Sequence, residues 1–300
     1  MRPDWIAVDW GTSNLRAWAM HGAEILAGAS SDDGMGKLKR AEFEPALLRL
    51  IEPWLLADAM PVVACGMVGS RQGWHEAPYR SVPCTPIEPG ALVRVPTLDS
   101  RISMNIAPGL KQTTPADVMR GEETQIAGGL ALLPDFDGVF CLPGTHSKWA
   151  HISAGEVVSF QTYMTGELFA LLSTQSVLRH SLTAEGWDDA AFDQGVDEAI
   201  SRPEKISARL FTLRAEGLIA GLSANAARAR LSGLLIGIEL AAARPYWLGQ
   251  RVVLIGSDKL TATYSRALGI LGLASQRLDA TTCTLSGLAT ASLSLRKAIK

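Results

Sequence analysis

Two segments of the sequence, one near its start and one near its middle, repeat the same pattern of an apolar strand, a Gly-Thr turn and a second strand. The first segment reads IAVDWGTSNLRAW and the second reads VFCLPGTHSKWA, so that Gly11-Thr12 corresponds to Gly144-Thr145. Glycine allows backbone N–H groups to approach an anion closely, and the threonine hydroxyl adds another donor. The repeat therefore predicts a duplicated architecture in which each turn binds phosphate oxygens.

Each turn alone is also typical of an ordinary β-hairpin, so the prediction rests on the pairing of the two. Two turns that face each other across a cleft would hold a nucleotide triphosphate from both sides. Asp9 stands just before the first turn and would point its carboxylate into the same cleft, where it would bind Mg²⁺ directly or through water. The alternative is that Asp9 only stabilises the hairpin.

The spacing of apolar residues predicts an α/β protein with mixed sheets, because strand-like runs alternate with segments of helical periodicity. The predicted strands are residues 5–9, 15–20, 62–65, 139–142, 148–152 and 252–255. The predicted helices are residues 43–56, 122–133, 165–178, 209–214, 231–243 and 258–268. We expect the domain boundary near Pro134, which gives one domain of residues 1–133 and another of residues 134–300.

The composition argues against several classes of protein. Basic and acidic residues number 28 and 30 and are well mixed, and the formal net charge of −2 supplies no strong field to attract nucleic acid. There is no run of about 18 apolar residues, which argues against a membrane span. The N-terminal stretch lacks the apolar core of a secretory signal. Four scattered cysteines without a CxxC pair predict reduced thiols and a cytoplasmic protein. The sequence is compatible with a homodimer but does not fix the oligomeric state.

The signatures of other enzyme classes are missing from the sequence. It contains no GxxxxGK[ST], GxSxG, HExxH or GxGxxG motif, and its five histidines show no zinc-ligand spacing. A third candidate feature is the segment VVLIGSDKLTATY, in which an apolar strand ends at Gly256-Ser257 and a helix begins. Backbone without an obstructing side chain suits an adenosine pocket, although a strand-Gly-helix junction is common in other proteins.

These motifs resemble those of the superfamily that contains actin, hexokinase and the heat-shock chaperones. Residues 9–13 (DWGTS) resemble its phosphate-1 motif, residues 143–147 (PGTHS) its phosphate-2 motif, and residues 254–257 (LIGS) its adenosine motif. Within the superfamily, the chain is similar to the 2-dehydro-3-deoxygalactonokinase family. The similar blocks, in that family's order, are DWGTSNLRAW, GMVGSRQGW, MRGEETQ, LPGTHSKW, TYMTGELF and LIGSDKLTATY.

The resemblance implies an α/β fold of two duplicated ribonuclease-H-like domains, the actin-like ATPase fold, with a nucleotide in the interdomain cleft. It implies ATP and Mg²⁺ as cofactors, and transfer of the γ-phosphoryl group to the primary hydroxyl of a sugar acid, 2-dehydro-3-deoxygalactonate. The implied phosphate-binding residues are Gly11, Thr12, Ser13, Gly144, Thr145, His146, Ser147 and Lys148. The implied adenosine-binding residues are Gly256, Ser257 and Lys259, and the implied metal ligand is Asp9.

The second phosphate turn departs from the wider superfamily, which usually carries an Asp before its glycines. Leu142 and Pro143 stand there instead, so other residues must supply the catalytic carboxylate. With Asp9, the catalytic candidates are Glu122 and Glu123, in a stretch similar to the Gly-Glu-Glu segment of exopolyphosphatases. Adjacent helical residues point to different faces, so we expect one of the two glutamates to face the cleft. The alternative is that both are first-turn acids favoured by the helix dipole.

Substrate contacts are expected in the irregular segment of residues 66–89, which is rich in Gly and Pro, because such loops are often functional. Arg71 is the candidate for gripping the substrate carboxylate, since a guanidinium forms two parallel hydrogen bonds with it. Ser70 stands beside it, and Trp74 would wall the pocket. The alternatives are an exposed loop arginine and a packed aromatic residue.

Two other functions stay open at the level of sequence. An exopolyphosphatase-like hydrolase would share both phosphate turns but use water as the nucleophile. A non-enzymatic nucleotide switch of the chaperone or filament type would bind ATP without turning over any sugar acid.

Overall fold

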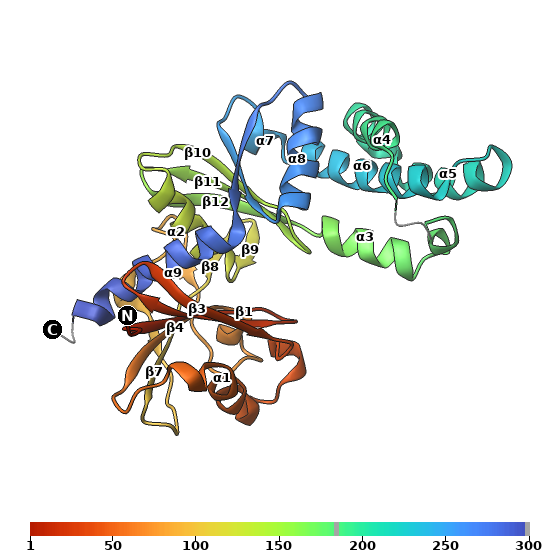
Figure 1. Cartoon of the computed structure of the whole chain (residues 1–300). Coiled ribbons are helices and arrows are strands. Elements are labelled where there is room, and N and C mark those ends of the chain that lie inside the picture. Colours follow the sequence, from red (N-terminus) through yellow and green to blue (C-terminus); the bar gives the residue numbers. More distant parts are fainter. Residues whose placement is uncertain (183–185, 298–300) are drawn as a thin grey trace. The chain divides into compact units, whose positions relative to one another are not determined.

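The computed structural model describes residues 1–182 and 186–297 (Figure 1). The chain forms two compact units. The first comprises Met1–Asp137, Ile152–Ser159 and the described residues from Asp279 onward, and the second comprises Gly138–His151 and Phe160–Leu278. This division differs from a single cut at Pro134, because the C-terminal helix groups with the first unit.

The first unit is built on a six-stranded sheet with the order β3-β2-β1-β4-β7-β6. The chain enters it through an antiparallel meander, which confirms the first predicted hairpin. The central strand β1 also pairs in parallel with β4, and β4 pairs in parallel with β7. The strands are β1 (Trp5–Trp10), β2 (Leu15–His21), β3 (Glu24–Ser31), β4 (Met60–Gly66), β6 (Val93–Arg94) and β7 (Ile102–Ile106).

Helix α1 (Phe43–Ile51) packs against β2 and β3. It is shorter than predicted, because Pro53 follows and residues 52–54 form a 3₁₀ turn instead. A small second sheet in the first unit has the order β5-β8-β9, with β5 (Arg80–Ser81), β8 (Leu110–Thr113) and β9 (Ala116–Met119).

Helices α2 (Glu122–Leu132) and α9 (Ala280–Lys297) pack together within the first unit. Two glycines allow this approach. A Cβ atom at Gly128 would lie 1.8 Å from the Cys283 carbonyl oxygen, and one at Gly287 would lie 2.0 Å from the Thr124 carbonyl oxygen. No other residue fits at either position without separating the helices, so this contact is a fixed feature of the unit.

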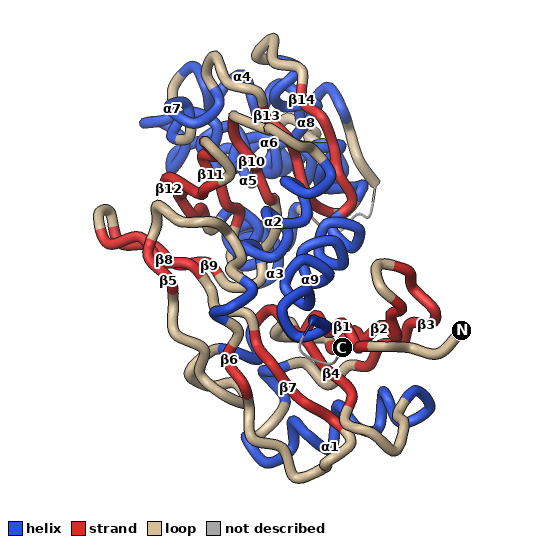
Figure 2. The backbone as a smooth tube through the Cα atoms, turned by 90° about the vertical axis from the view of Figure 1, so that its left-hand side faces the viewer, coloured by secondary structure: helices blue, strands red, loops and turns tan. Residues whose placement is uncertain are grey.

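A five-stranded sheet with the order β12-β11-β10-β13-β14, visible in Figure 2, forms the centre of the second unit, although the residues where β11 ends and β12 begins group with the first unit. Its strands are β10 (Gly138–Leu142), β11 (Ser147–Ser153), β12 (Glu156–Tyr163), β13 (Val252–Gly256) and β14 (Ser275–Asp279). Position by position, this order repeats β3-β2-β1-β4-β7, and β10 pairs in parallel with β13 as β1 does with β4. The sequence repeat therefore marks a duplicated ribonuclease-H-like sheet, and the predicted actin-like ATPase fold is confirmed.

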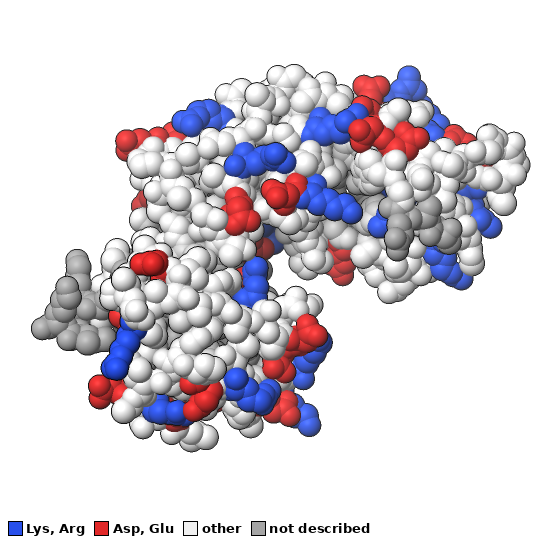
Figure 3. All heavy atoms as spheres, in the orientation of Figure 1, with Lys and Arg blue, Asp and Glu red and all other residues white. Residues whose placement is uncertain are grey.

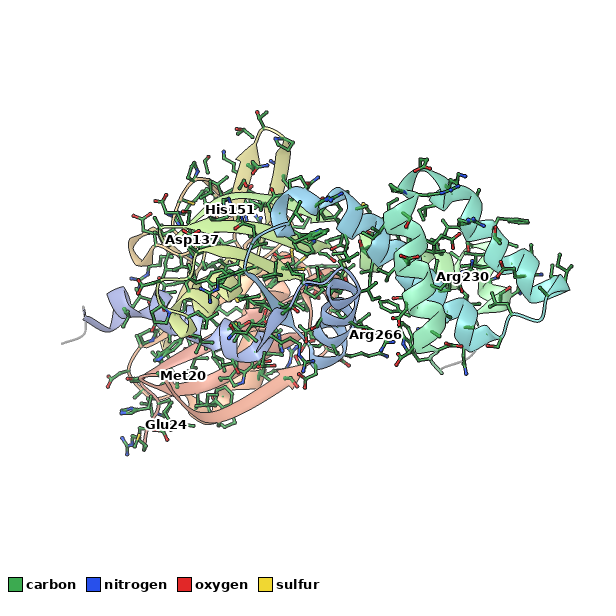
Figure 4. All side chains as sticks on the ribbon, turned by 90° about the horizontal axis from the view of Figure 1, so that it is seen from above. Met20, Glu24, Asp137, His151, Arg230 and Arg266 are labelled. Carbon is green, nitrogen blue, oxygen red and sulfur yellow. The ribbon has the colours of Figure 1, made fainter. Side chains whose placement is uncertain are left out.

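The second unit also contains a group of helices that follows β12. They are α3 (Thr165–Thr174), α4 (Asp189–Ser201), α5 (Ile206–Ile219), α6 (Ala224–Ala242), α7 (Arg244–Trp247) and α8 (Asp258–Ile270). Two arginines labelled in Figure 4, Arg230 and Arg266, connect four of these helices through ion pairs. Arg230 of α6 contacts Glu198 of α4 and Glu216 of α5, and Arg266 of α8 contacts Asp193 of α4.

Two further features are the distribution of charge on the surface and the apolar character of the helices. Basic and acidic side chains are interspersed on the face drawn in Figure 3, with no large field of one sign. Within residues 1–182 and 186–297, no helix combines the length and the apolar character that a membrane span requires.

Candidate active site

The turn between β1 and β2 projects its polar residues outward from a rigid base. The Gly11 amide donates to the Asn14 carbonyl at 3.0 Å, and the Gly36 amide donates to the Thr12 carbonyl at 2.9 Å. A Cβ atom at Gly34 would lie 2.3 Å from the Thr12 carbonyl oxygen, so the segment around Gly34 packs directly on the turn. Thr12 and Ser13 are exposed. This geometry suits a turn whose backbone and hydroxyl groups meet a phosphate.

Asp9 lies at the carboxyl end of β1, beside the start of the loop that follows β4. Its side chain is 17% exposed and forms an ion pair with Arg16, its cross-strand partner. Gly66 ends β4 with a φ of +91°, and a Cβ atom there would lie 2.7 Å from the Trp10 carbonyl oxygen and 3.5 Å from Asp9 Oδ1. A side chain at Gly66 would therefore crowd the Asp9 carboxylate.

The two glutamates at the start of α2 differ sharply in burial. Glu122 is half-buried and accepts a hydrogen bond from the Arg120 amide at 3.0 Å. Glu123 is completely buried and accepts hydrogen bonds from the Gly121 amide at 2.7 Å and the Thr124 hydroxyl at 3.0 Å. Burial, reinforced by the charge of Glu122, raises the pKa of Glu123 to about 8.

Asp9 and the start of α2 belong to one cluster. A Cβ atom at Gly121 would lie 3.4 Å from the Gly66 Cα atom, so α2 begins beside the end of β4. Burial raises the pKa of the Cys65 thiol, and the charges of Asp9 and Glu123 raise it further, which reflects how near both carboxyl groups lie. The first unit therefore places Asp9 near the start of α2, where Glu122 and Glu123 stand, and of these three carboxyl groups those of Asp9 and Glu122 are partly accessible.

The residues predicted to contact substrate in the loop after β4 do not lie together. Trp74 is 7% exposed and packs in the core, with its ring centroid 6.2 Å from that of Trp10 and 6.4 Å from that of Phe43. The Arg71 side chain is 83% exposed, with Nε 3.9 Å from a Glu76 oxygen. Ser70 is buried. The structure thus gives Trp74 a packing role and leaves Arg71 in solvent.

A different arginine, which the sequence analysis did not select, is buried against this loop. Arg120 is 9% exposed, its Nη2 donates to the Ala77 carbonyl at 2.7 Å, and its guanidinium lies 4.3 Å from the centre of the Tyr79 ring. The only sequence signal for it was its place in the MRGEETQ block, directly before the two glutamates.

In the second unit, the β10–β11 turn and the end of β13 lie side by side. A Cβ atom at Gly256 would lie 3.2 Å from Thr261 Cγ2 and 3.6 Å from the Pro143 carbonyl oxygen. The parallel pairing of β10 with β13 produces this neighbourhood, because the carboxyl ends of parallel strands meet at one edge of a sheet. The predicted phosphate-2 and adenosine motifs are therefore adjacent in the fold.

The β10–β11 turn also rests on the first turn of α3. A Cβ atom at Gly166 would lie 2.3 Å from the Gly144 carbonyl oxygen, and the Glu167 amide donates to the Thr145 carbonyl at 2.9 Å. His146 Nε2 lies 2.6 Å from a carboxylate oxygen of Glu167. Thr145 and His146 are exposed, so the turn presents them to solvent on a fixed base.

A buried network of polar side chains packs against the β10–β11 turn. Glu239 of α6, which is 2% exposed, accepts hydrogen bonds from Trp149 Nε1 and the Tyr264 hydroxyl, both at 2.8 Å, and from the Thr165 hydroxyl. Burial raises the pKa of Glu239. The Ser147 hydroxyl lies 2.9 Å from the Tyr264 hydroxyl, so it belongs to this network rather than to the exposed face of the turn.

Lys148 is also buried, at 4% exposure, and its Nζ donates to the His146 carbonyl at 3.4 Å. It is therefore a part of the turn's support and not a solvated hairpin lysine.

A cavity of about 870 Å³ opens beside the turn, and the described residues that line it all belong to the second unit. Gly144 and Lys259 line it, whereas Gly256 and Ser257 do not. Its aromatic lining includes Phe169 and Trp187, and the guanidinium of Arg228 lies 5.1 Å from the centre of the Phe169 ring. Flat aromatic surfaces and a neighbouring cation suit a purine base.

The chain was compared with known families and structures. The sequence model of the 2-keto-3-deoxy-galactonokinase family matches residues 9–291. The chain is 36% identical to the 2-dehydro-3-deoxygalactonokinase of Escherichia coli (strain K12), with 91% of each chain covered. It is 38% identical to the probable 2-dehydro-3-deoxygalactonokinase of Rhizobium meliloti (strain 1021), with 95% of each covered.

A solved structure gives the same result in three dimensions. A crystal structure from Sinorhizobium meliloti, whose description names a 2-dehydro-3-deoxygalactonokinase, superimposes with a TM-score of 0.88 at 35% identity, covering 97% of this chain and 99% of that chain. The sequence and the fold therefore agree, and the chain belongs to the 2-keto-3-deoxy-galactonokinase family of sugar-acid kinases.

Proposed function

We propose that this kinase transfers the γ-phosphoryl group of ATP to the primary 6-hydroxyl of 2-dehydro-3-deoxy-D-galactonate, a step in galactonate catabolism. The observation that carries the proposal is the pair of equivalent hairpin turns, each at the end of a central strand with its threonine exposed. One turn lies beside the carboxyl groups of the first unit, and the other lies beside the 870 Å³ cavity of the second.

The second unit binds the nucleotide in this proposal. The base enters the cavity lined by Phe169 and Trp187, and Lys259 at its edge approaches the nucleotide's negative charge. Gly144 and Thr145 offer backbone and hydroxyl donors to the phosphates. The network around Glu239 holds the turn in place before ATP arrives, and preorganised donors lose no energy to reorganisation at the moment of reaction.

The first unit binds the sugar acid and activates its hydroxyl. As the hydroxyl oxygen attacks the γ-phosphorus, its proton passes to a carboxylate and ADP leaves. Of the three candidate carboxylates, Asp9 and Glu122 are partly exposed, so we assign the activation of the acceptor hydroxyl to them. Glu123 is buried and positions the start of α2 through its hydrogen bonds with Gly121 and Thr124.

The donor set of the first unit fits a Mg²⁺ ion held chiefly by nucleotide phosphates. In the described part of the chain there is no group of three or more His, Cys, Asp or Glu side chains that would form a metal cage. Mg²⁺ in phosphoryl-transfer enzymes commonly takes one or two carboxylates together with substrate phosphates and water. Asp9 is the carboxylate that would hold it. When bound, the ion neutralises charge on the phosphates.

We also propose that the enzyme works in the cytoplasm. All four cysteines carry free thiols, and Cys65, Cys141 and Cys283 are buried, which is the state that a reducing compartment maintains.

The experiment that tests the proposal is an ATP-consumption screen with the purified protein. The panel contains 2-dehydro-3-deoxy sugar acids, aldonates and free neutral sugars. The account predicts the highest kcat/KM for 2-dehydro-3-deoxy-D-galactonate and strict dependence on Mg²⁺. Rapid ATP consumption without any sugar would point to a hydrolase, and a preference for neutral sugars would overturn the substrate class.

A further inference from the structure

Two buried polar side chains in the first unit lack the hydrogen-bond partners that burial normally demands. Arg120 Nε and Nη1 are covered by protein, but neither donates a hydrogen bond to another described residue. The Ser70 hydroxyl is equally covered and equally without a partner. Buried polar groups are nearly always paired, because an unpaired donor loses its bonds to water and gains nothing. Two such groups in one region indicate a ligand.

The two side chains lie in the same neighbourhood. A Cβ atom at Gly69 would lie 2.8 Å from Arg120 Nη1, so the guanidinium rests against the backbone immediately before Ser70. The Tyr79 ring stacks near the guanidinium, and the Ala77 carbonyl accepts from Nη2. The loop of residues 69–79 thus contacts Arg120 at both Nη1 and Nη2, and it leaves Nε and Nη1 without a hydrogen-bond acceptor.

The ligand that satisfies this arrangement is a carboxylate. A carboxylate has two oxygens that accept charge-assisted hydrogen bonds, so one oxygen can accept from Arg120 Nη1 and the other from the Ser70 hydroxyl. Among residues 1–182 and 186–297 no carboxylate forms an ion pair with the Arg120 side chain, whose contacts are the Ala77 carbonyl and the Tyr79 ring. Glu122, two residues later, stands at the start of α2, where we place acceptor activation.

We infer that Arg120, assisted by Ser70, binds the carboxylate of the sugar acid and determines the preference of the enzyme for acids over neutral sugars. This inference rests on the proposed function, because it assumes a sugar-acid substrate. The backbone at Gly69 lies against Nη1, so in this inference the loop of residues 69–79 moves aside as the carboxylate enters. Arg71, on the same loop, stays in solvent and takes no part.

The test compares Arg120→Gln with Arg71→Gln, a matched control that removes an exposed charge from the loop that contacts Arg120. Two substrates are used: 2-dehydro-3-deoxy-D-galactonate and the 3-deoxy-2-ketohexose that carries a hydroxymethyl group in place of the carboxylate. Arg120→Gln should reduce the ratio of the two kcat/KM values by about thirtyfold or more, because a buried charge pair loses one partner. The KM for ATP should stay within about threefold, and Arg71→Gln should leave the ratio unchanged.

A purely structural role predicts a different result. If Arg120 only clamps the loop, Arg120→Gln will lower kcat/KM equally for both substrates and leave their ratio intact, which overturns the inference. If Arg120→Gln does not fold, Ser70→Ala decides the matter, since it removes one hydroxyl. It should raise the KM for the acid about tenfold and leave that for the neutral sugar unchanged, and an unchanged KM for the acid overturns the inference. A wild-type enzyme without activity on the acid would instead refute the proposed function.

Discussion

At the scale of single residues, the account depends first on Asp9. We expect Asp9→Asn to lower kcat by about a hundredfold or more and to weaken the dependence on Mg²⁺, because a positioned carboxylate is lost. The fold should persist, since the Asp9–Arg16 ion pair is partly exposed and such pairs contribute little to stability. Steady-state kinetics and a thermal melt check both points. Near-normal turnover in Asp9→Asn would remove this residue from the mechanism.

The paired glutamates should respond differently to the same isosteric change. Glu122→Gln should reduce kcat about a hundredfold, because Glu122 is the accessible carboxylate at the start of α2. Glu123→Gln should lower kcat by less than about tenfold, since the oxygen of the introduced amide can still accept one of the hydrogen bonds that position the helix. Measured kcat values for the two variants provide the comparison. The reverse order would transfer the catalytic role to the buried residue.

Glu123 should also give the protein a distinct pH dependence of stability. Its pKa is about 8 in the folded protein and 4.5 in an ordinary environment, so the folded state binds more protons between these values. The contribution of Glu123 to the free energy of unfolding therefore falls as the pH rises through this window. The free energy of unfolding of the wild type, relative to that of Glu123→Gln, should decrease from about pH 5 to about pH 9. A constant difference across denaturation curves in this range would contradict the assigned burial.

Sequence reasoning located the motifs at residue scale but not every contact. Asp9, Gly11 and Thr12 lie where the pattern predicts, because strand and turn are local features. The sequence does not show which of Arg71 and Arg120 is buried. Arg120 is buried because the loop after β4 packs against it, and the Ala77 carbonyl that it contacts lies 43 residues away in the sequence. Burial of this kind is set by tertiary packing, which a single sequence does not display.

At the scale of elements, the junction between β13 and α8 controls the phosphate-2 turn. Gly256→Val should raise the KM for ATP about tenfold or more, because its branched side chain would collide with Pro143 and Thr261 and displace the turn. The KM for the sugar acid should stay within about threefold, since its proposed contacts lie in the first unit. Gly269→Val is the matched control, because a side chain there meets open space. Equal losses for both substrates in a folded Gly256→Val protein would contradict the assignment.

Many of the central elements of the fold were predicted from the sequence. Both hairpins, strands β4 and β13 and helices α2, α6 and α8 lie where apolar runs, glycine turns and helical spacing placed them, although α6 begins at Ala224 and not at residue 231. Helices α4 and α9 were not predicted, since their sequences DAAFDQGVDEAIS and ATTCTLSGLATASLSLRK are dominated by small or polar residues. Close packing through glycines replaces large side chains in them, as at Gly195 of α4 against Gly233 of α6.

At the scale of the whole molecule, the duplication was predictable and the division of the chain was not. The repeated Gly-Thr hairpin indicated two sheets of the same order, and the structure has them. The sequence predicted a single domain boundary near Pro134, but the chain returns to the first unit after Leu278, where it forms α9. The C-terminal helix groups with the first unit because α9 packs against α2 through Gly128 and Gly287. Contacts made through glycines give no periodic pattern of apolar residues that would predict this packing from the sequence.

The central claim is that the γ-phosphoryl group of ATP reaches a primary hydroxyl of a sugar acid, and the most direct test is the proton-coupled ³¹P NMR spectrum of the reaction mixture. The wild-type enzyme, ATP, Mg²⁺ and 2-dehydro-3-deoxy-D-galactonate are incubated until ATP is consumed. The account predicts ADP and one new phosphomonoester whose phosphorus signal is a triplet, because a phosphate on a CH₂ carbon couples to two protons. A doublet would mean transfer to a secondary hydroxyl, and inorganic phosphate without any ester would mean hydrolysis; either result would contradict the account.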